Sequence, residues 1–125
     1  MKTSLGTNVN LLLGLQSQLK IMHWQTKEYA QHMAFGGIYD DLQDLIDTFV
    51  ELAMGKYGRF ELSNENNTIE LVNLDDMDFA GFINTMRKAL VQITKQLDST
   101  DTDMLNVRDE MLGLINKLSY LLTLK

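Results

Sequence analysis

The chain has 125 residues, a net charge of −6 and a hydrophobic content of 45%. This is the size of one domain, with enough apolar residues for a core and too many for a disordered tail. The absence of cysteine excludes disulfides, thiol nucleophiles and thiolate metal sites. No apolar run reaches the ~20 residues of a membrane-spanning helix, and the start lacks a signal-peptide pattern, so we expect a cytoplasmic protein with no membrane partner.

Apolar residues recur at intervals of three and four along a chain without proline, which predicts helices rather than strands. Four helices are expected, over residues 7–30, 36–56, 78–98 and 101–123. Gly55 or Gly58 is expected to end the second helix. The cluster Ser99-Thr100-Asp101 is expected to cap the fourth. The sequence therefore predicts a single all-α domain over residues 1–125.

The connections between these helices constrain their arrangement. A few residues join the third and fourth helices, so these two are expected to be antiparallel neighbours. The segment 57–77 between the second and third helices is far longer than a usual helix-to-helix turn. Its length permits a crossover from one end of the bundle to the other, which is the ferritin-like arrangement. A long loop that stays at one end of the bundle would have the same length. Residues 68–74 fit either a short extended piece or a helical turn.

Without cysteine, a metal site would use histidine, aspartate or glutamate, a donor set that favours iron, manganese or zinc. Five acids fall on the second predicted helix: Asp40, Asp41, Asp44, Asp47 and Glu51. Asp47 and Glu51 lie ~40° apart around a helix, so both carboxylates can reach one ion. A solvated acidic face is the alternative, and it is the commoner meaning of such a pattern.

His23 and His32 are the only two histidines. Their separation corresponds to ~900° around an unbroken helix, which places them on opposite faces. Either the chain breaks between them, or they reach different ligand sets, including sets shared across a subunit boundary. Considered without the other candidate ligands, His23 beside Trp24 could also be a structural histidine that is packed in the interior and hydrogen-bonded there.

Three pieces of the chain resemble the Dps family, the small ferritins of bacteria and archaea. The first piece is the pair His23-Trp24 in the first predicted helix. The second is the run from His32 to the Asp47-x-x-x-Glu51 spacing. The third is the last helix, with Asp101-x-Asp103 near its start and Tyr120-Leu121-Leu122 near its end.

This resemblance implies a ferritin-like four-helix bundle that forms a homo-oligomer, in the family a dodecameric hollow shell. It implies ferroxidase centres between two subunits, with histidines from one subunit and carboxylates from its partner. His23, His32, Asp47 and Glu51 are then the metal ligands, with no further catalytic residue. Iron, or another divalent metal, would bind there, and ferrous iron would be oxidised by hydrogen peroxide or oxygen and stored as mineral.

The chain departs from the family in two places. At Gly36 the family usually has an aspartate, and the basic tail that many members use to hold DNA is essentially absent here. With a net charge of −6 and Lys2 as the only base in the first ten residues, we expect no DNA binding. Two functions remain open: an iron-oxidising and iron-storing enzyme, or a ferritin-like structural or interaction protein whose metal site has been lost at Gly36. Burial of Trp24 and Tyr29 against a partner would favour an oligomer.

Overall fold

The computed structural model describes residues 5–62 and 68–125. Over these residues the chain is helical and has no strand. The long helices are α1 (Leu5–Gln25), α2 (Tyr29–Tyr57), α3 (Phe79–Thr94) and α4 (Thr102–Leu121), and a short 3-10 turn, η2 (Leu74–Asp76), precedes α3. The prediction of an all-α protein with four helices is confirmed.

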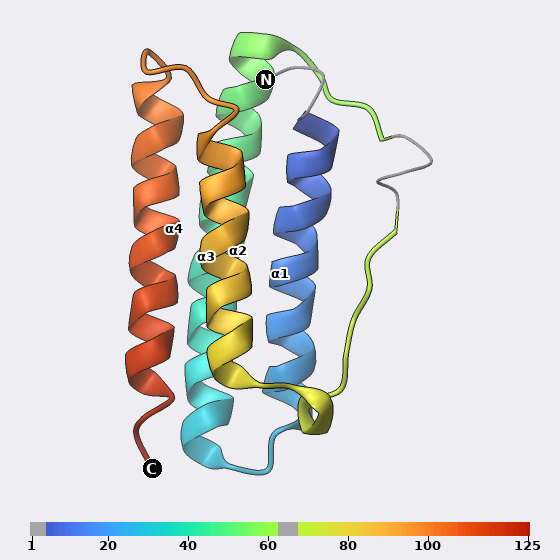
Figure 1. Cartoon of the computed structure of the whole chain (residues 1–125), viewed down its shortest axis with the longest axis vertical. Coiled ribbons are helices and arrows are strands. Elements are labelled where there is room, and N and C mark those ends of the chain that lie inside the picture. The colour runs from blue at the N-terminus through green and yellow to red at the C-terminus, as the bar shows by residue number, and fades with distance from the viewer. Residues whose placement is uncertain (1–4, 63–67) are drawn as a thin grey trace.

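The four helices form a bundle in which contacting helices run in opposite directions (Figure 1). Helix α1 packs on α2, α2 on α4 and α4 on α3, with a lighter contact between α1 and α3. Helices α2 and α3 run in the same direction, so the chain returns along the bundle between them. Residues 68–74 of this return, which we call the strap, follow α1 along the outer margin. Residues 63–67 of the predicted crossover lie outside the described residues.

Each helix buries one apolar stripe, because residues three and four apart lie on the same helix face. On α3, for example, the stripe contains Phe82, Met86 and Ile93. The stripes of the four helices meet in one core, whose largest fully buried side chains include Phe35, Phe49, Met22, Met86, Met104 and Met111. In the described part of the chain, no helix combines the length and apolar character needed to span a membrane.

The boundary between the first two helices differs from the prediction. Helix α1 ends at Gln25 rather than near residue 30, and α2 begins at Tyr29 rather than at 36. Neither proline nor glycine marks this break. The turn is held instead by Thr26, whose Oγ1 accepts a hydrogen bond from the Glu28 amide (3.2 Å) and donates one to Gln31 Oε1 (2.7 Å). Because the break falls between the two histidines, His23 lies on α1 and His32 on α2, and the two rings can face each other.

The remaining helix ends lie close to the predicted ones. Helix α2 ends at Tyr57 because Gly58 follows with a φ of 90°, a left-handed conformation that favours glycine. The Gly58 amide donates to the carbonyl oxygen of Met54 (2.8 Å). Helix α3 ends at Thr94 rather than at 98, because the chain tightens there, and the Leu97 amide donates to the Thr94 carbonyl (3.1 Å). The fourth helix begins at residue 102 rather than 101.

Candidate functional site

His23, near the end of α1, and His32, in the first turn of α2, lie face to face. Their ring centroids are 3.9 Å apart and their planes are inclined by 18°. Nδ1 of His23 lies 2.8 Å from the carbonyl oxygen of His32, and Nδ1 of His32 lies 2.9 Å from the carbonyl oxygen of His23. A carbonyl oxygen only accepts hydrogen bonds, so each Nδ1 carries a proton and donates it. In the neutral imidazoles, Nε2 of both rings therefore keeps a free lone pair.

Gly36, one turn beyond His32 on α2, provides the space for the His23 ring. A β-carbon on residue 36 would lie 2.7 Å from Cε1 and 2.8 Å from Nδ1 of His23. These distances are too short for non-bonded atoms in a packed interior, where carbon atoms approach to about 3.5–4.0 Å. The stacked pair is therefore compatible only with glycine at this position. Gly36, which the sequence presented as the place of a lost ligand, has a packing role.

The acids of α2 lie apart from the histidines. Asp40, Asp44, Asp47 and Glu51 are all exposed, on the side of α2 opposite its buried residues. At 1.5 Å per residue, Asp47 lies ~22 Å farther along α2 than His32. In the described part of one chain, no group of three or more histidines and acids is arranged to hold a metal ion. Within one chain the two histidines come together, and the two predicted carboxylate ligands, Asp47 and Glu51, do not join them.

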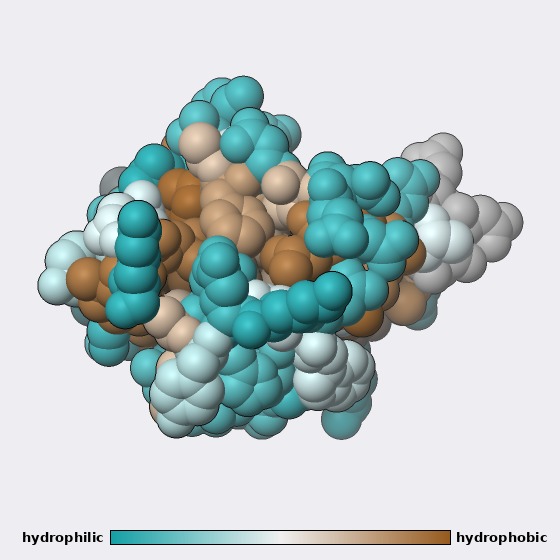
Figure 2. All heavy atoms as spheres, turned by 90° about the horizontal axis from the view of Figure 1, so that it is seen from below, coloured by the Kyte–Doolittle hydropathy of each residue, from teal (hydrophilic) through white to brown (hydrophobic). Residues whose placement is uncertain are grey.

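The end of the bundle that carries the histidine pair also exposes apolar side chains. Trp24 is 66% exposed and Tyr29 is 76% exposed. Figure 2 looks onto this end and shows apolar residues gathered in its middle, with hydrophilic residues around them. A groove of about 370 Å³ opens there between the start of α2 and the end of α4, lined by side chains that include Met33, Leu121 and Leu124. Exposed apolar surface of this kind is typical of a site that contacts another molecule.

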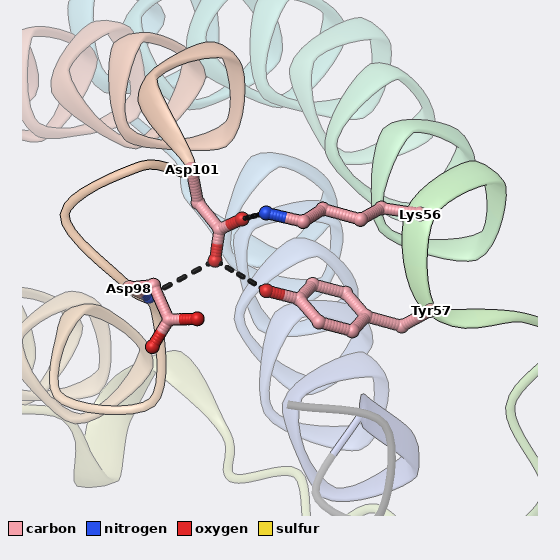
Figure 3. A network of polar contacts seen from close by, with 4 residues as sticks. All are labelled: Lys56, Tyr57, Asp98 and Asp101. Carbon is pink, nitrogen blue, oxygen red and sulfur yellow. Dashed lines mark hydrogen bonds and ion pairs between the residues drawn. The ribbon is translucent and has the colours of Figure 1, made fainter.

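A second polar cluster lies at the opposite end of the bundle (Figure 3). The side chain of Asp101 is fully buried, and its Oδ1 forms an ion pair with Lys56 Nζ. Its Oδ2 accepts hydrogen bonds from the Tyr57 hydroxyl (2.6 Å) and the Asp98 amide (2.9 Å). Burial alone would raise the pKa of Asp101, but the hydrogen bonds from Lys56, Tyr57 and the Asp98 amide outweigh it and lower the pKa to about 2. We call this cluster the Asp101 clamp.

The Asp101 clamp ties the end of α2 to the turn between α3 and α4. Asp101 stands at the position predicted for a helix cap, but its carboxylate makes no hydrogen bond to the first turn of α4. The hydrogen bond to this carboxylate also raises the pKa values of Lys56 and Tyr57 above their ordinary values. Sequence reasoning did not find the clamp, because nothing in the spacing of these residues shows that they meet. Its charged groups are paired with each other, which suits a structural role.

The fold and the histidine pair describe a four-helix-bundle protein with two imidazoles joined at one end. Residues 23–122 match DUF5856, a family of unknown function, and the chain belongs to this family. The chain is also 41% identical over 51 residues to the "Uncharacterized 14.6 kDa protein in mobD-ri intergenic region" of Enterobacteria phage T4. That alignment covers 41% of this chain and 40% of the phage protein. No solved structure matches the chain.

Proposed function

We propose that this protein is a Dps-like, ferritin-like bundle that binds ferrous iron between two subunits, oxidises it and stores the product. His23 and His32 of one subunit would hold the metal together with Asp47 and Glu51 of a second subunit. The observation that carries this proposal is the reciprocal contact of the histidines, in which Nδ1 of each ring faces the carbonyl oxygen of the other residue, so that Nε2 is the nitrogen of each neutral ring that could bind a metal. Metal-binding histidines almost always donate their other N–H to a carbonyl, a carboxylate or water, which orients the ring and raises its basicity.

The distance between the histidines and the carboxylates supports a site shared by two subunits. In a two-fold dimer, each site can take its histidines from one subunit and its acids from the other. The ~22 Å that separates His32 from Asp47 along α2 then becomes roughly the spacing between two equal sites. Trp24 and Tyr29 supply exposed apolar surface beside the histidines for such a contact.

The donor set and the charge of the chain suit a divalent cation. Imidazole nitrogen with carboxylate oxygen is a mixed shell that iron accepts, and manganese or zinc would accept it as well. The acidic outer face of α2 would raise the local concentration of cations. Each ferrous ion would give up one electron to oxygen or hydrogen peroxide. The return of the chain between α2 and α3 fits the ferritin-like arrangement, and a closed cytoplasmic shell, dodecameric in the resembling family, would hold the ferric product.

Mixing two inactive variants tests the shared site. One variant combines His23→Ala with His32→Ala, and the other combines Asp47→Asn with Glu51→Gln. Each alone should oxidise ferrous iron in air no faster than buffer, as followed by the absorbance of the ferric product. Subunits mixed, unfolded and refolded together should recover about a quarter of the wild-type rate, because half of random dimers are mixed and each mixed dimer has one intact site. Asp41→Asn, an exposed acid outside the proposed ligand set, serves as the control and should keep the full rate.

Two outcomes would contradict this proposal in different ways. A mixture that stays at the buffer rate while wild type is active would place the ligands within one subunit. Wild-type protein that oxidises iron no faster than buffer would remove the enzymatic function.

The same histidine contact also favours a second candidate, a structural or interaction protein in which the pair only joins α1 to α2. Each ring bonds the backbone of the other helix, so the pair is a latch even without metal. In that case His23→Ala should lower the melting temperature, and wild-type protein should show no change in melting temperature on addition of Fe²⁺ or Co²⁺. A ligand that binds only the folded state raises the melting temperature, so a clear increase with either ion would exclude a purely structural pair.

A further inference from the structure

Helices α2 and α3 each carry charge of a single sign on the outside of the bundle. Between residues 40 and 51 the chain has five acids and no base, and between residues 79 and 95 it has three bases and no acid. What we call the acidic stripe consists of four exposed residues on the outer face of α2: Asp40, Asp44, Asp47 and Glu51. What we call the basic stripe consists of three exposed residues on α3 and its C-cap: Lys88, Val91 and Lys95. Residues at this spacing share one helix face, and in both helices it is the face opposite the buried residues.

The two stripes face opposite sides of the molecule. Helices α2 and α3 occupy diagonal corners of the bundle, because each packs on both α1 and α4. In Figure 1, α3 lies in front of α2, with α1 and α4 at the two sides. The stripes therefore cannot neutralise each other within one chain. Within residues 5–62 and 68–125, neither lysine of the basic stripe and no acid of the acidic stripe forms an ion pair.

The stripes also lie at the same height along the bundle. The ring of Phe35 on α2 meets the ring of Phe79 on α3 edge-on, with 5.6 Å between their centroids. The two helices run in the same direction and rise equally per residue, so positions equally far beyond this contact stand level with each other. Asp44 and Lys88 both lie nine residues beyond it. The two charges are therefore level, on opposite sides of the bundle.

We propose that copies of this chain associate side by side, with the acidic stripe of one copy on the basic stripe of the next. A sideways shift without rotation brings Asp44 opposite Lys88 of the next copy. Glu51 and Lys95 each lie seven residues further along, about 10.5 Å in either helix, so the same shift brings them opposite each other. The two ion pairs form together in one register, and this match selects a second copy of the chain as the partner.

The centre of the basic stripe is shaped to receive a neighbouring helix. Val91 is 51% exposed between the two lysines, and all three residues line a groove of about 390 Å³ along α3. In the proposed register Asp47 of the next copy falls opposite Val91, and the long side chains of Lys88 and Lys95 can reach it from both sides. The contact therefore covers an exposed apolar side chain and surrounds a third carboxylate with positive charge.

The contact joins two different faces, so it is heterologous. After two copies have joined, one stripe remains free at each end, and further copies can add. The association is therefore not limited to dimers. It does not rest on the proposed metal site, but Asp47 and Glu51 of one chain cannot serve both contacts at once. The tests therefore use metal-free protein in the presence of a chelator.

Salt should weaken the contact, because exposed ion pairs are individually weak and are screened. At about 0.1 M salt the screening length is ~10 Å, which reduces the repulsion between copies of net charge −6 while charges in contact still attract. At about 1 M salt the screening length is ~3 Å. We therefore expect association of concentrated protein at the lower salt concentration and less at the higher one. An association that strengthens with salt would contradict a contact based on charge.

Exchanging the charges of one pair tests the contact directly. Lys88→Glu and Asp44→Lys each place like charges opposite each other, so the association constant measured by sedimentation should fall about tenfold. The double variant with both changes restores opposite charges and should recover most of the wild-type association. Lys27→Glu, at an exposed lysine in the turn between α1 and α2, changes the net charge as Lys88→Glu does and should lower the constant far less. A double variant no better than the single variants, or wild type that is monomeric at every concentration, would overturn the proposal.

Cross-linking gives an independent readout of the register. A water-soluble carbodiimide joins a carboxylate to a lysine amine where the two are in contact. Equal amounts of unlabelled and ¹⁵N-labelled protein are treated together and digested. Peptides joined through Asp44 and Lys88 should include forms with one labelled partner, which mark a bond between two chains, and cross-linked trimers should accompany the dimers. Products that stop at the dimer, or cross-links that involve neither stripe, would also overturn the proposal.

Discussion

The imidazole of His23 lies in the space that a β-carbon on residue 36 would fill, with Cε1 at 2.7 Å from that position. The two residues therefore constrain each other, because a side chain at 36 forces the ring of His23 out of the stack. The contacts of each Nδ1 with a carbonyl oxygen, which accompany the stack, in turn set which nitrogen of each neutral ring is free. A glycine with no functional atom thus controls the presentation of the two proposed metal ligands.

Gly36→Ala should weaken the histidine pair and the fold. The added methyl group would overpack the space of the His23 ring, at a cost of about 1–3 kcal/mol. Gly37→Ala is a matched control on the same helix, because a β-carbon there meets no atom within 4 Å. Replacing that glycine should raise stability by up to ~1 kcal/mol through helix propensity. Thermal unfolding of both variants checks this, and equal shifts of the melting temperature would contradict the steric argument.

In metal-free protein, the neutral form of both imidazoles should carry its proton on Nδ1. The reason is that each Nδ1 faces a backbone carbonyl oxygen, at 2.8 Å for His23 and 2.9 Å for His32. Long-range ¹H–¹⁵N correlation spectra of the ring nitrogens distinguish the two tautomers. Spectra with the proton on Nε2 of either ring would remove the structural basis for metal binding.

Asp101→Asn should destabilise the protein by about 2 kcal/mol, the range for loss of hydrogen bonds to a charged group. The change would leave Lys56 and Tyr57 without their carboxylate partner. Asp98→Asn is the control, because Asp98 joins the clamp through its backbone amide and its side chain is exposed. Chemical unfolding of the two variants should separate them clearly, and similar unfolding free energies would show that the clamp contributes little.

The stability supplied by the Asp101 clamp should depend on pH at the acid end. The pKa of Asp101 is about 2 in the folded protein and 3.8 is its ordinary value, so the ionised carboxylate favours the folded state. This contribution is present above about pH 4 and is lost as the pH falls towards 2. The difference in unfolding free energy between wild type and Asp101→Asn should therefore shrink over that range. A difference that stays constant would contradict the assignment.

Gln18→Leu should release the middle of the strap. Gln18 holds both backbone groups of Val72, and its loss should cost about 1–2 kcal/mol locally. The Val72 amide should then exchange with deuterium faster than in wild type. Gln16→Leu is the matched control, because Gln16 donates to the Tyr39 hydroxyl (3.4 Å) and not to the strap, and it should leave that exchange unchanged. Slow exchange of Val72 in both variants would show that the strap does not rely on Gln18.

Much of the fold follows from periodicity in the sequence. Apolar residues at helical spacing predicted the four helices, because residues three and four apart form one continuous apolar face only when the segment is helical. Gly58 was one of the two residues expected to end α2, and its positive φ gives the physical reason. Long, strongly patterned elements were therefore the reliable part of the prediction.

The remaining features depend on side chains that meet through tertiary structure. The break after Gln25 is made by Thr26, Glu28 and Gln31, and these residues also occur within helices, so the pattern alone does not show a turn. The contact of Gly36 with His23 and the pairing of Asp101 with Lys56 join residues on different elements. Sequence spacing within one helix cannot show either of them. For the candidate site, the sequence predicted four ligands, and the structure adds that the two histidines lie together while the two carboxylates lie apart from them in one chain.

The attachment of the strap to α1 at three points links the lengths of two distant parts of the chain. One extra turn in α1 would lengthen it by 5.4 Å, and an extended chain needs about two residues to cover that distance. An insertion between two of the anchoring residues Asn10, Gln18 and Gln25, without a matching insertion in the strap, would move the side-chain amide beyond it away from its backbone partner. Natural variants of this protein should therefore gain or lose residues in α1 and in the strap together, so that the two segments stay equal in length.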